Sequence, residues 1–254
     1  RYTFKHALVR DAAYDSLLKS RRQQLHRSIY DALSAEIEMA SPDILAVHAA
    51  GAGRHLDAAR HGLAAGRHAL DRWAPREAVQ HLRRASDHLT MDGAGKVGDE
   101  LELEVQRWLA PALLATYGYS AEDTGRAYSR TATLARAANL VDIEAEARFG
   151  SFLFHLVRGD LAEAMAVAEA KLADAADDQV DRAMAHRAAG TCALFEGSFD
   201  LAKSHLNDAS ARLATSSTKP SVNKYVFDPG TSIGAFTSLA SLALGKIDEA
   251  EALQ

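Results

Sequence analysis

The sequence is poor in residues that interrupt helices or cross-link a chain. Its 254 residues include 5 prolines, one cysteine and 7% aromatic residues. A single cysteine excludes an internal disulfide, and the lack of regular Val and Ile alternation argues against an all-β or a doubly wound α/β fold. No uncharged apolar run reaches the 18 or so residues that span a bilayer, and the N-terminus lacks a signal-peptide pattern. We therefore expect a cytoplasmic protein with no membrane partner.

Alanine is the residue that the sequence has in excess. It occupies 52 positions, and it has the highest intrinsic helix propensity. Long runs of Ala, Leu, Glu and Arg therefore predict an all-α fold. The hydrophobic fraction of 48% and the charged fraction of 25% are typical of a folded globular chain and exclude wholesale disorder.

Positive charge is concentrated at the beginning of the chain. Residues 1–30 contain seven Lys or Arg against two Asp, although the whole chain has a formal net charge of −5. A basic stretch of this kind can contact nucleic acid, but the same residues equally suit a solvent-exposed helix face. We therefore do not expect nucleic acid as a partner of this region.

A short phrase recurs three times in the second half of the chain. It begins at Gly159, at Gly197 and at Gly245, so its spacings are 38 and 48 residues. In each copy Gly tolerates the left-handed backbone that ends a helix, Asp or Ser can supply a capping oxygen, and a small Ala lets the next helix approach closely. The phrase predicts repeated pairs of helices joined by short turns.

The residue spacing resembles that of the tetratricopeptide repeat (TPR), which has a small residue at position 8, another at position 20, a larger apolar residue at position 24 and Ala at position 27. Two stretches match this pattern at Gly66, Ala78, Leu82 and Ala85, and at Gly190, Ala202, Leu206 and Ala209. The resemblance implies an α–α superhelix whose concave groove binds a peptide, a partner domain or a small effector. A generic helical bundle is the alternative.

The TPR register also predicts which side chains line this groove. In the first matching repeat they are Arg60, Leu63, Arg67 and Asp71, and in the second they are Met184, Arg187, Thr191 and Phe195. Between these repeats the groove residues are Glu146, Phe149, Leu153 and Leu156. From these sets we select Arg60, Arg67, Asp71, Phe149, Leu153, Arg187 and Phe195 as candidate partner-binding residues. Packing in the core is the alternative role for Phe149 and Leu153.

Two glycine- or proline-rich stretches divide the predicted helices. Residues 92–98 predict a linker before a helix that begins near Asp99, and residues 215–231 predict a loop. We expect an N-terminal segment at 1–40, a first TPR-like block at 41–92 and a second block at 99–254. Because the chain opens without Met and stops inside an amphipathic run, we expect it to be a piece of a longer protein whose second block is truncated.

Motifs for catalysis or metal binding are weak. Gly95 and Lys96 lack the earlier glycine and the following Ser or Thr of a phosphate-binding loop. The histidines of residues 48–88 are mostly six or seven positions apart rather than at the i, i+4 spacing of a helical metal site. We interpret them as surface residues, and we expect no metal site, no catalytic residues and no cofactor in this chain.

The N-terminal segment carries a more specific resemblance. The stretch from Phe4 to Leu18, followed by the basic run 20–27, resembles the end of the winged-helix unit that follows the nucleotide-binding core of bacterial STAND-type signalling ATPases. These AAA-like switch proteins have TPR C-terminal regions, and many carry a class III adenylate or guanylate cyclase domain. Residues 109–119, 128–135 and 227–230 agree with the same family.

The family resemblance implies a role for this chain and a nucleotide in its parent. The phrase Lys5–Asp11 is similar to the Met-His-Asp motif of related switches, so that His6 would sense bound ADP; Lys5 and Ala7 depart from that motif. The parent would bind ATP or ADP with Mg, whereas this non-catalytic region would sense a protein or small effector and contact the upstream ATPase core. The alternatives are the sensor region of a LuxR-type transcriptional regulator and a free-standing TPR scaffold.

Overall fold

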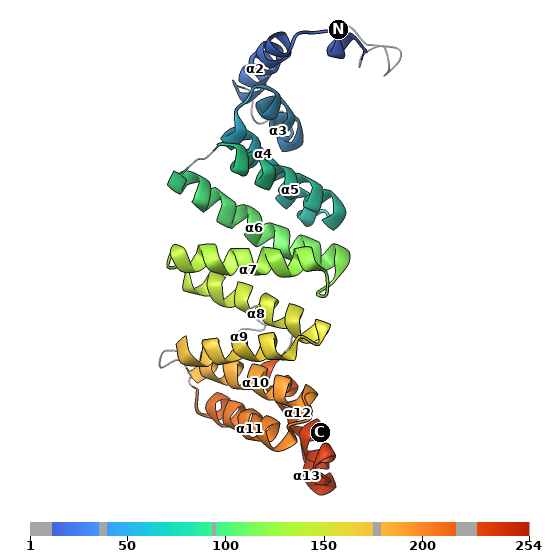
Figure 1. The fold of residues 1–254 in the computed structure, drawn as a ribbon, viewed down its shortest axis with the longest axis vertical. Coiled ribbons are helices and arrows are strands. Elements are labelled where there is room, and N and C mark those ends of the chain that lie inside the picture. Colours follow the sequence, from blue (N-terminus) through green and yellow to red (C-terminus); the bar gives the residue numbers. More distant parts are fainter. Residues whose placement is uncertain (1–11, 36–39, 93–94, 175–178, 217–227, 254) are drawn as a thin grey trace. The chain divides into compact units, whose positions relative to one another are not determined.

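The fold is a succession of helical hairpins. The computed structural model describes residues 12–35, 40–92, 95–174, 179–216 and 228–253, and these residues contain helices and turns but no strand (Figure 1). The chain divides into two compact units, residues 1–118 with 126–141 and residues 119–125 with 142–254. The expectation of an all-α TPR-like repeat fold is confirmed.

The first unit contains the helices up to α6 and most of α7. Their bounds are α2 Lys19–Ala35, α3 Pro42–Gly51, α4 His55–Asp71, α5 Pro75–Asp92, α6 Gly95–Tyr117 and α7 Glu122–Ala137. Consecutive helices from α2 through to α6 pack against each other, and α4 also contacts α6. The expected linker at 92–98 is shorter than predicted, because α6 begins at Gly95 rather than near Asp99. The domain boundary placed there stays a prediction.

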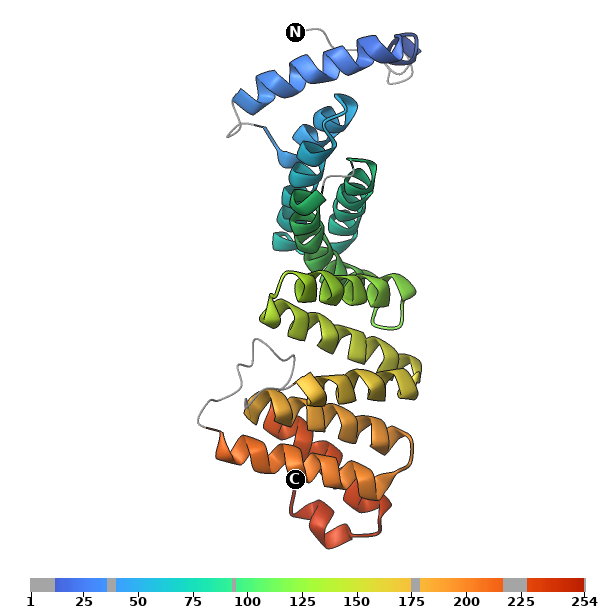
Figure 2. The ribbon, with the colours of Figure 1, turned by 60° about the vertical axis from the view of Figure 1, so that its left-hand side comes forward.

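The second unit contains the remaining helices. Their bounds are α8 Val141–Arg158, α9 Leu161–Asp174, α10 Gln179–Phe195, α11 Phe199–Thr215, α12 Pro229–Ala243 and α13 Ile247–Glu251. Helices α10 and α11 lie side by side, and α12 packs against both (Figure 2). Helix α12 begins inside the stretch predicted to be a loop. The signal for this start is present in the sequence: Asp228 caps the helix and Pro229 occupies its first turn, where no amide donor is needed.

Close contacts between paired helices follow the predicted TPR register. A Cβ added to Gly66 would lie 2.5 Å from Cγ of Leu82, and one added to Gly190 would lie 2.7 Å from Cγ of Leu206. Both leucines are fully buried. Ala85 is also fully buried. The small residue of one helix therefore accepts the leucine of the next helix in both repeats, as the spacing predicts.

The turns between helices also follow the recurring phrase, with one correction. Gly159, Gly197 and Gly245 have φ values of 79°, 84° and 74°, which confirms the predicted left-handed helix ends. The predicted side-chain cap is wrong for Ser198, whose side chain makes no capping hydrogen bond, and for the third copy, where Lys246 occupies the N-cap position. The backbone carbonyl of Ser198 accepts from the amide of Ala202 at 2.9 Å, as that of an N-cap residue does with any side chain.

Candidate functional site

A cavity of about 440 Å³ in the second unit is the best candidate for a binding site. Most of its surface is apolar and comes from aromatic and aliphatic side chains. The lining residues are Phe149, Phe152, Leu153, Leu156, Arg187, Thr191, Asp228, Thr231, Ser232, Ala235 and Phe236. They come from α8, α10 and the beginning of α12, so three segments that are distant in sequence form one site.

Helix α8 supplies the apolar wall of this cavity. Phe149, Leu153 and Leu156 are three or four residues apart, which places them on one face of a helix. The ring of Phe152 lies 6.3 Å from that of Phe149 and is 3% exposed, in a core with Ala164 of α9. Small residues of α9 and α10 therefore pack against the buried side of α8, and the larger side chains of α8 line the cavity.

Helix α12 supplies the polar rim. Oδ2 of Asp228 accepts hydrogen bonds from the backbone N–H of Thr231 at 2.7 Å and from its hydroxyl at 2.9 Å. These hydrogen bonds to Thr231 lower the pKa of Asp228 below its ordinary value. The carboxylate thus stabilises the first turn of α12 and fixes where Ser232 and Phe236 reach the cavity.

Arg187 is the cation of this site. Its side chain belongs to the buried set, at 7% exposure, and its guanidinium lies 5.5 Å from the centre of the Phe149 ring. The hydroxyl of Thr191, one turn later on α10, donates to the carbonyl of Arg187 at 2.8 Å. A buried arginine stacked on an aromatic ring offers both a positive charge and a flat surface. Such a wall suits a ligand with an apolar body and an acidic or π-rich group.

The structure brings together three of the four candidate partner-binding residues of this unit and leaves one apart. Phe149, Leu153 and Arg187 all line the cavity. Phe195 does not line it and is 59% exposed at the end of α10. Sequence reasoning missed Phe236, because the first turn of α12 lies in the stretch predicted to be a loop.

The predicted groove residues of the first unit do not share one site. Asp71 lines a second cavity, of about 310 Å³, between the start of α3 and helices α4 and α5. The guanidinium of Arg67 lies 5.0 Å from the centre of the Trp108 ring on α6. Arg60 pairs with Asp57 on its own helix at 3.3 Å. Neither arginine lines the second cavity.

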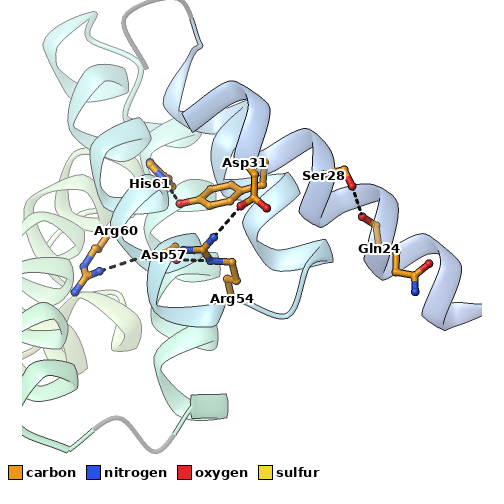
Figure 3. A network of polar contacts seen from close by, with 8 residues as sticks. Gln24, Ser28, Asp31, Arg54, Asp57, Arg60 and His61 are labelled. Carbon is orange, nitrogen blue, oxygen red and sulfur yellow. Dashed lines mark hydrogen bonds and ion pairs between the residues drawn. The ribbon is translucent and has the colours of Figure 1, made fainter. Parts of the chain in front are cut away.

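Arg60 lies at the edge of a polar network that joins α2 to α4. Figure 3 shows Arg54 between two carboxylates, with contacts of 3.1 Å to Asp31 and 2.7 Å to Asp57. The hydroxyl of Tyr30 meets Nε2 of His61 at 3.1 Å in the same region. This network fixes the position of α2 and gives Arg60 a structural contact.

The remaining predictions concern nucleotide sensing, metal binding and membrane spanning. His6 lies outside the described residues, so its role as a nucleotide sensor stays a prediction. Within the described part of the chain, no three His, Cys, Asp or Glu side chains group closely enough to hold a metal ion. In the same residues we find no helix with the length and apolarity needed to cross a membrane.

The comparisons with known sequences are sparse. No protein-family model matches the chain. An uncharacterized protein from Rhizobium meliloti (strain 1021) is 33% identical over 138 residues, which are 53% of this chain and 13% of that protein. The chain therefore matches only a small part of a much longer relative.

Solved structures are similar in fold. The quorum sensor NprR from B. thuringiensis has a TM-score of 0.55 at 13% identity, over 96% of this chain and 66% of its own. BtubC from P. vanneervenii has a TM-score of 0.55 at 14% identity, over 98% and 89%. A Podosopora anserina protein with nearly identical TPR-like repeats, assigned to the kinesin light chains, has a TM-score of 0.54 at 15% identity, over 76% and 90%. These likenesses establish a TPR-like helical-repeat fold.

Proposed function

We propose that this chain is the non-catalytic sensor region of a signalling protein and that it binds its effector in the cavity of the second unit. The observation that carries the proposal is the cavity itself, in which Arg187 is stacked on Phe149 among apolar side chains. TPR-like repeats serve as interaction surfaces because stacked helix pairs expose continuous grooves. The expected effector has an apolar part and an acidic group, as a small organic acid or a short peptide with an acidic residue would have.

The binding proposal can be tested with a dye that has this chemistry. 1-Anilinonaphthalene-8-sulfonate combines aromatic rings with a sulfonate, and its fluorescence rises in an apolar site. We expect saturable binding to the purified chain. Ala235 is exposed on the rim, so Ala235→Trp should fill the cavity and abolish saturable binding without disturbing the core. Leu239→Trp is the matched control, because Leu239 is exposed on the same helix and does not line the cavity.

The outcome is informative in either direction. Equal dye binding by the two tryptophan variants would show that the dye reports another surface, and the cavity would then lose its proposed role. Loss of binding in Ala235→Trp alone would support the cavity. Circular dichroism at neutral pH should give the same helix content for both variants.

We further propose that the parent protein is a STAND-type ATPase linked to an adenylate or guanylate cyclase. This part rests on the N-terminal resemblance at residues 4–27 and on the order of the later phrases. In the longer protein, His6→Leu should lower ADP retention and change the output, whereas Ala235→Trp should remove the response to the effector and leave ADP retention unchanged. A parent without an upstream phosphate-binding loop would refute the ATPase assignment and leave the TPR-like scaffold.

A further inference from the structure

Histidines from neighbouring helices form hydrogen-bonded pairs at three places in the fold. In each pair the Nδ1 atom of one ring faces the Nδ1 atom of the other. The pairs and their Nδ1–Nδ1 distances are His26–His48 at 3.1 Å, His55–His88 at 3.3 Å and His186–His205 at 3.0 Å. They join α2 to α3, α4 to α5 and α10 to α11. The prediction that the histidines of residues 48–88 are surface residues is therefore wrong for the paired rings. These rings are part-buried where two neighbouring helices meet, and we call each such contact a helix joint.

Each pair can hold only a limited number of protons. A neutral imidazole has one N–H donor and one acceptor nitrogen, so one Nδ1 must donate and the other must accept. A first added proton can bind at an Nε2 atom and leaves this hydrogen bond intact. A second added proton places an N–H on both facing nitrogens, so neither can accept. It also makes both rings positive, with facing nitrogens about 3 Å apart, and these charges repel strongly in a part-buried site.

We propose that these three pairs make the helix joints α2–α3, α4–α5 and α10–α11 open in response to mild acid. An open pair can bind two protons, whereas a closed pair holds at most one. Opening is therefore coupled to the uptake of at least one proton per pair once the pH lies below the ordinary histidine pKa of about 6.5. The opening equilibrium of each joint then rises by about tenfold for each further pH unit and for each proton that opening takes up.

The α2–α3 pair has few electrostatic neighbours. Burial and then the charge of His26 lower the pKa of His48. The hydroxyl of Tyr14 lies 2.8 Å from Nε2 of His26, and the guanidinium of Arg22 lies over the Tyr14 ring. The His26 ring also rests on Gly51 of α3, where an added Cβ would lie 2.4 Å from Cγ of the ring. The ring therefore has little room to turn away from His48 while the joint is closed.

The α4–α5 pair has neighbours of both kinds. Burial and then His55 lower the pKa of His88, while Asp87 acts in the opposite direction. Helix α6 also packs on these helices, where Gln106 donates a hydrogen bond to the hydroxyl of Ser86. Burial and the partner histidine thus outweigh Asp87.

The α10–α11 pair has charged neighbours of both signs. Burial lowers the pKa of His186 most, Asp208 opposes this, and His205, Arg212 and Arg182 lower it further. A carboxylate oxygen of Asp208 lies 3.9 Å from Nδ1 of His186. Because burial and the nearby positive groups together outweigh Asp208 and lower the pKa of His186, the neutral ring is favoured in the folded state here as well.

The sign of the pH effect is the same for all three pairs. A histidine whose folded pKa is lowered contributes stability that is fully present above its unfolded pKa and is lost as the pH falls toward the folded pKa. We therefore expect the closed joints at neutral pH and progressively more open joints below about pH 6.5.

Hydrogen–deuterium exchange of the full chain tests this proposal. After correction for the intrinsic rates, peptides from the three joints should exchange at least about tenfold faster at pH 5.0 than at pH 7.5. A triple variant with His48→Asn, His88→Asn and His186→Asn keeps a donor and an acceptor near each Nδ1 position, and each pair then has a single titratable ring and cannot bind a second proton. It should lose most of this acceleration. His68→Asn, which replaces an exposed histidine, is the matched control and should behave like the wild type.

Two results would overturn the proposal. One is an equal acceleration in the wild type and the triple variant, and the other is no acceleration in the wild type. If the triple variant fails to fold at pH 7.5, ring titration of the wild type by NMR decides instead. Each pair should then take up a single proton before the chain unfolds, and two protons on a folded pair would refute the mechanism.

Discussion

The joint between α10 and α11 allows a sharp test of the close-packing argument. We predict that Gly190→Ala destabilises the chain although alanine is the better helix former. An added Cβ would lie 2.7 Å from Cγ of Leu206 and 3.1 Å from the carbonyl oxygen of Ala202. Leu206 is fully buried, so it cannot swing into solvent, and the second neighbour is backbone. The two helices must therefore separate by up to about 1 Å to restore ordinary carbon–carbon contact.

The magnitude follows from two opposing terms. Replacing Gly by Ala within a helix gains about 1 kcal/mol, and overpacking a buried contact costs about 1–3 kcal/mol. Because the contact is well below van der Waals distance on two sides, we place the cost in the upper half of that range. The expected net loss is about 1–2 kcal/mol in the free energy of unfolding.

Gly234→Ala is the matched control on α12. The nearest atom to its added Cβ is the carbonyl oxygen of Leu253 at 3.7 Å, which is an ordinary contact. This variant should therefore be more stable than the wild type by about 0.5–1 kcal/mol. Urea unfolding followed by circular dichroism, analysed at constant m-value, measures both changes.

A double variant separates overpacking from other effects. Leu206→Ala alone should cost about 2–5 kcal/mol, because it leaves a cavity in a closed joint. In that background Gly190→Ala should destabilise much less, since the leucine that it meets is gone and only the carbonyl oxygen of Ala202, at 3.1 Å, remains close. The reasoning is refuted if Gly190→Ala is as stable as Gly234→Ala, or if its penalty persists unchanged in the absence of Leu206.

Three other perturbations test separate parts of the structure. Trp73 has a φ of 56° and is 93% exposed in a turn where other repeats have glycine. Trp73→Gly should therefore raise the free energy of unfolding by about 1 kcal/mol. A lower free energy of unfolding would reveal a stabilising contact of the indole. Burial raises the pKa of Cys192 to about 11, so the native thiol should react with a disulfide reagent at pH 8 at least about a hundredfold more slowly than in urea. Fast labelling of the folded chain would contradict its burial. Arg54→Met should lower the free energy of unfolding by about 0.5–1 kcal/mol, because it breaks the contacts to Asp31 and Asp57. In 1 M salt the difference between the variant and the wild type should become smaller. A loss of stability that does not depend on salt would point to packing instead.

The repeat architecture could be predicted because it depends on short spacings. Gly190 and Leu206 are 16 residues apart, the distance across one helical hairpin, and their contact needs no knowledge of the rest of the chain. Helix ends followed the same rule at Gly159 and Gly197, where a left-handed residue ends one helix. Trp73 has the same backbone geometry without glycine, so the glycine rule does not mark its turn.

The cavity could be predicted only in part. Phe149, Leu153 and Arg187 follow helical periodicity on α8 and α10, so the repeat register was enough to group them. Phe236 required the return of the chain after residue 216, which no periodic pattern specifies. The histidine pairs were missed for a similar reason: their partners are 19 to 33 residues apart and belong to different helices. A search for histidines one hairpin apart would have found them.

Side-chain size explains why the second unit has closed joints in one place and a cavity in another. Where α10 meets α11, Gly190 and Ala202 let the helices approach until Leu206 fills the gap between them. Around the cavity, α8 contributes the ring of Phe149 and α12 contributes the ring of Phe236. Open space remains between the helices that carry these large rings. Shortening a ring there should enlarge the cavity, whereas enlarging a small residue at the joint should force helices apart. The second unit therefore uses alanine and glycine for close helix contacts, whereas Phe149, Phe152 and Phe236 line the cavity that we propose binds the effector.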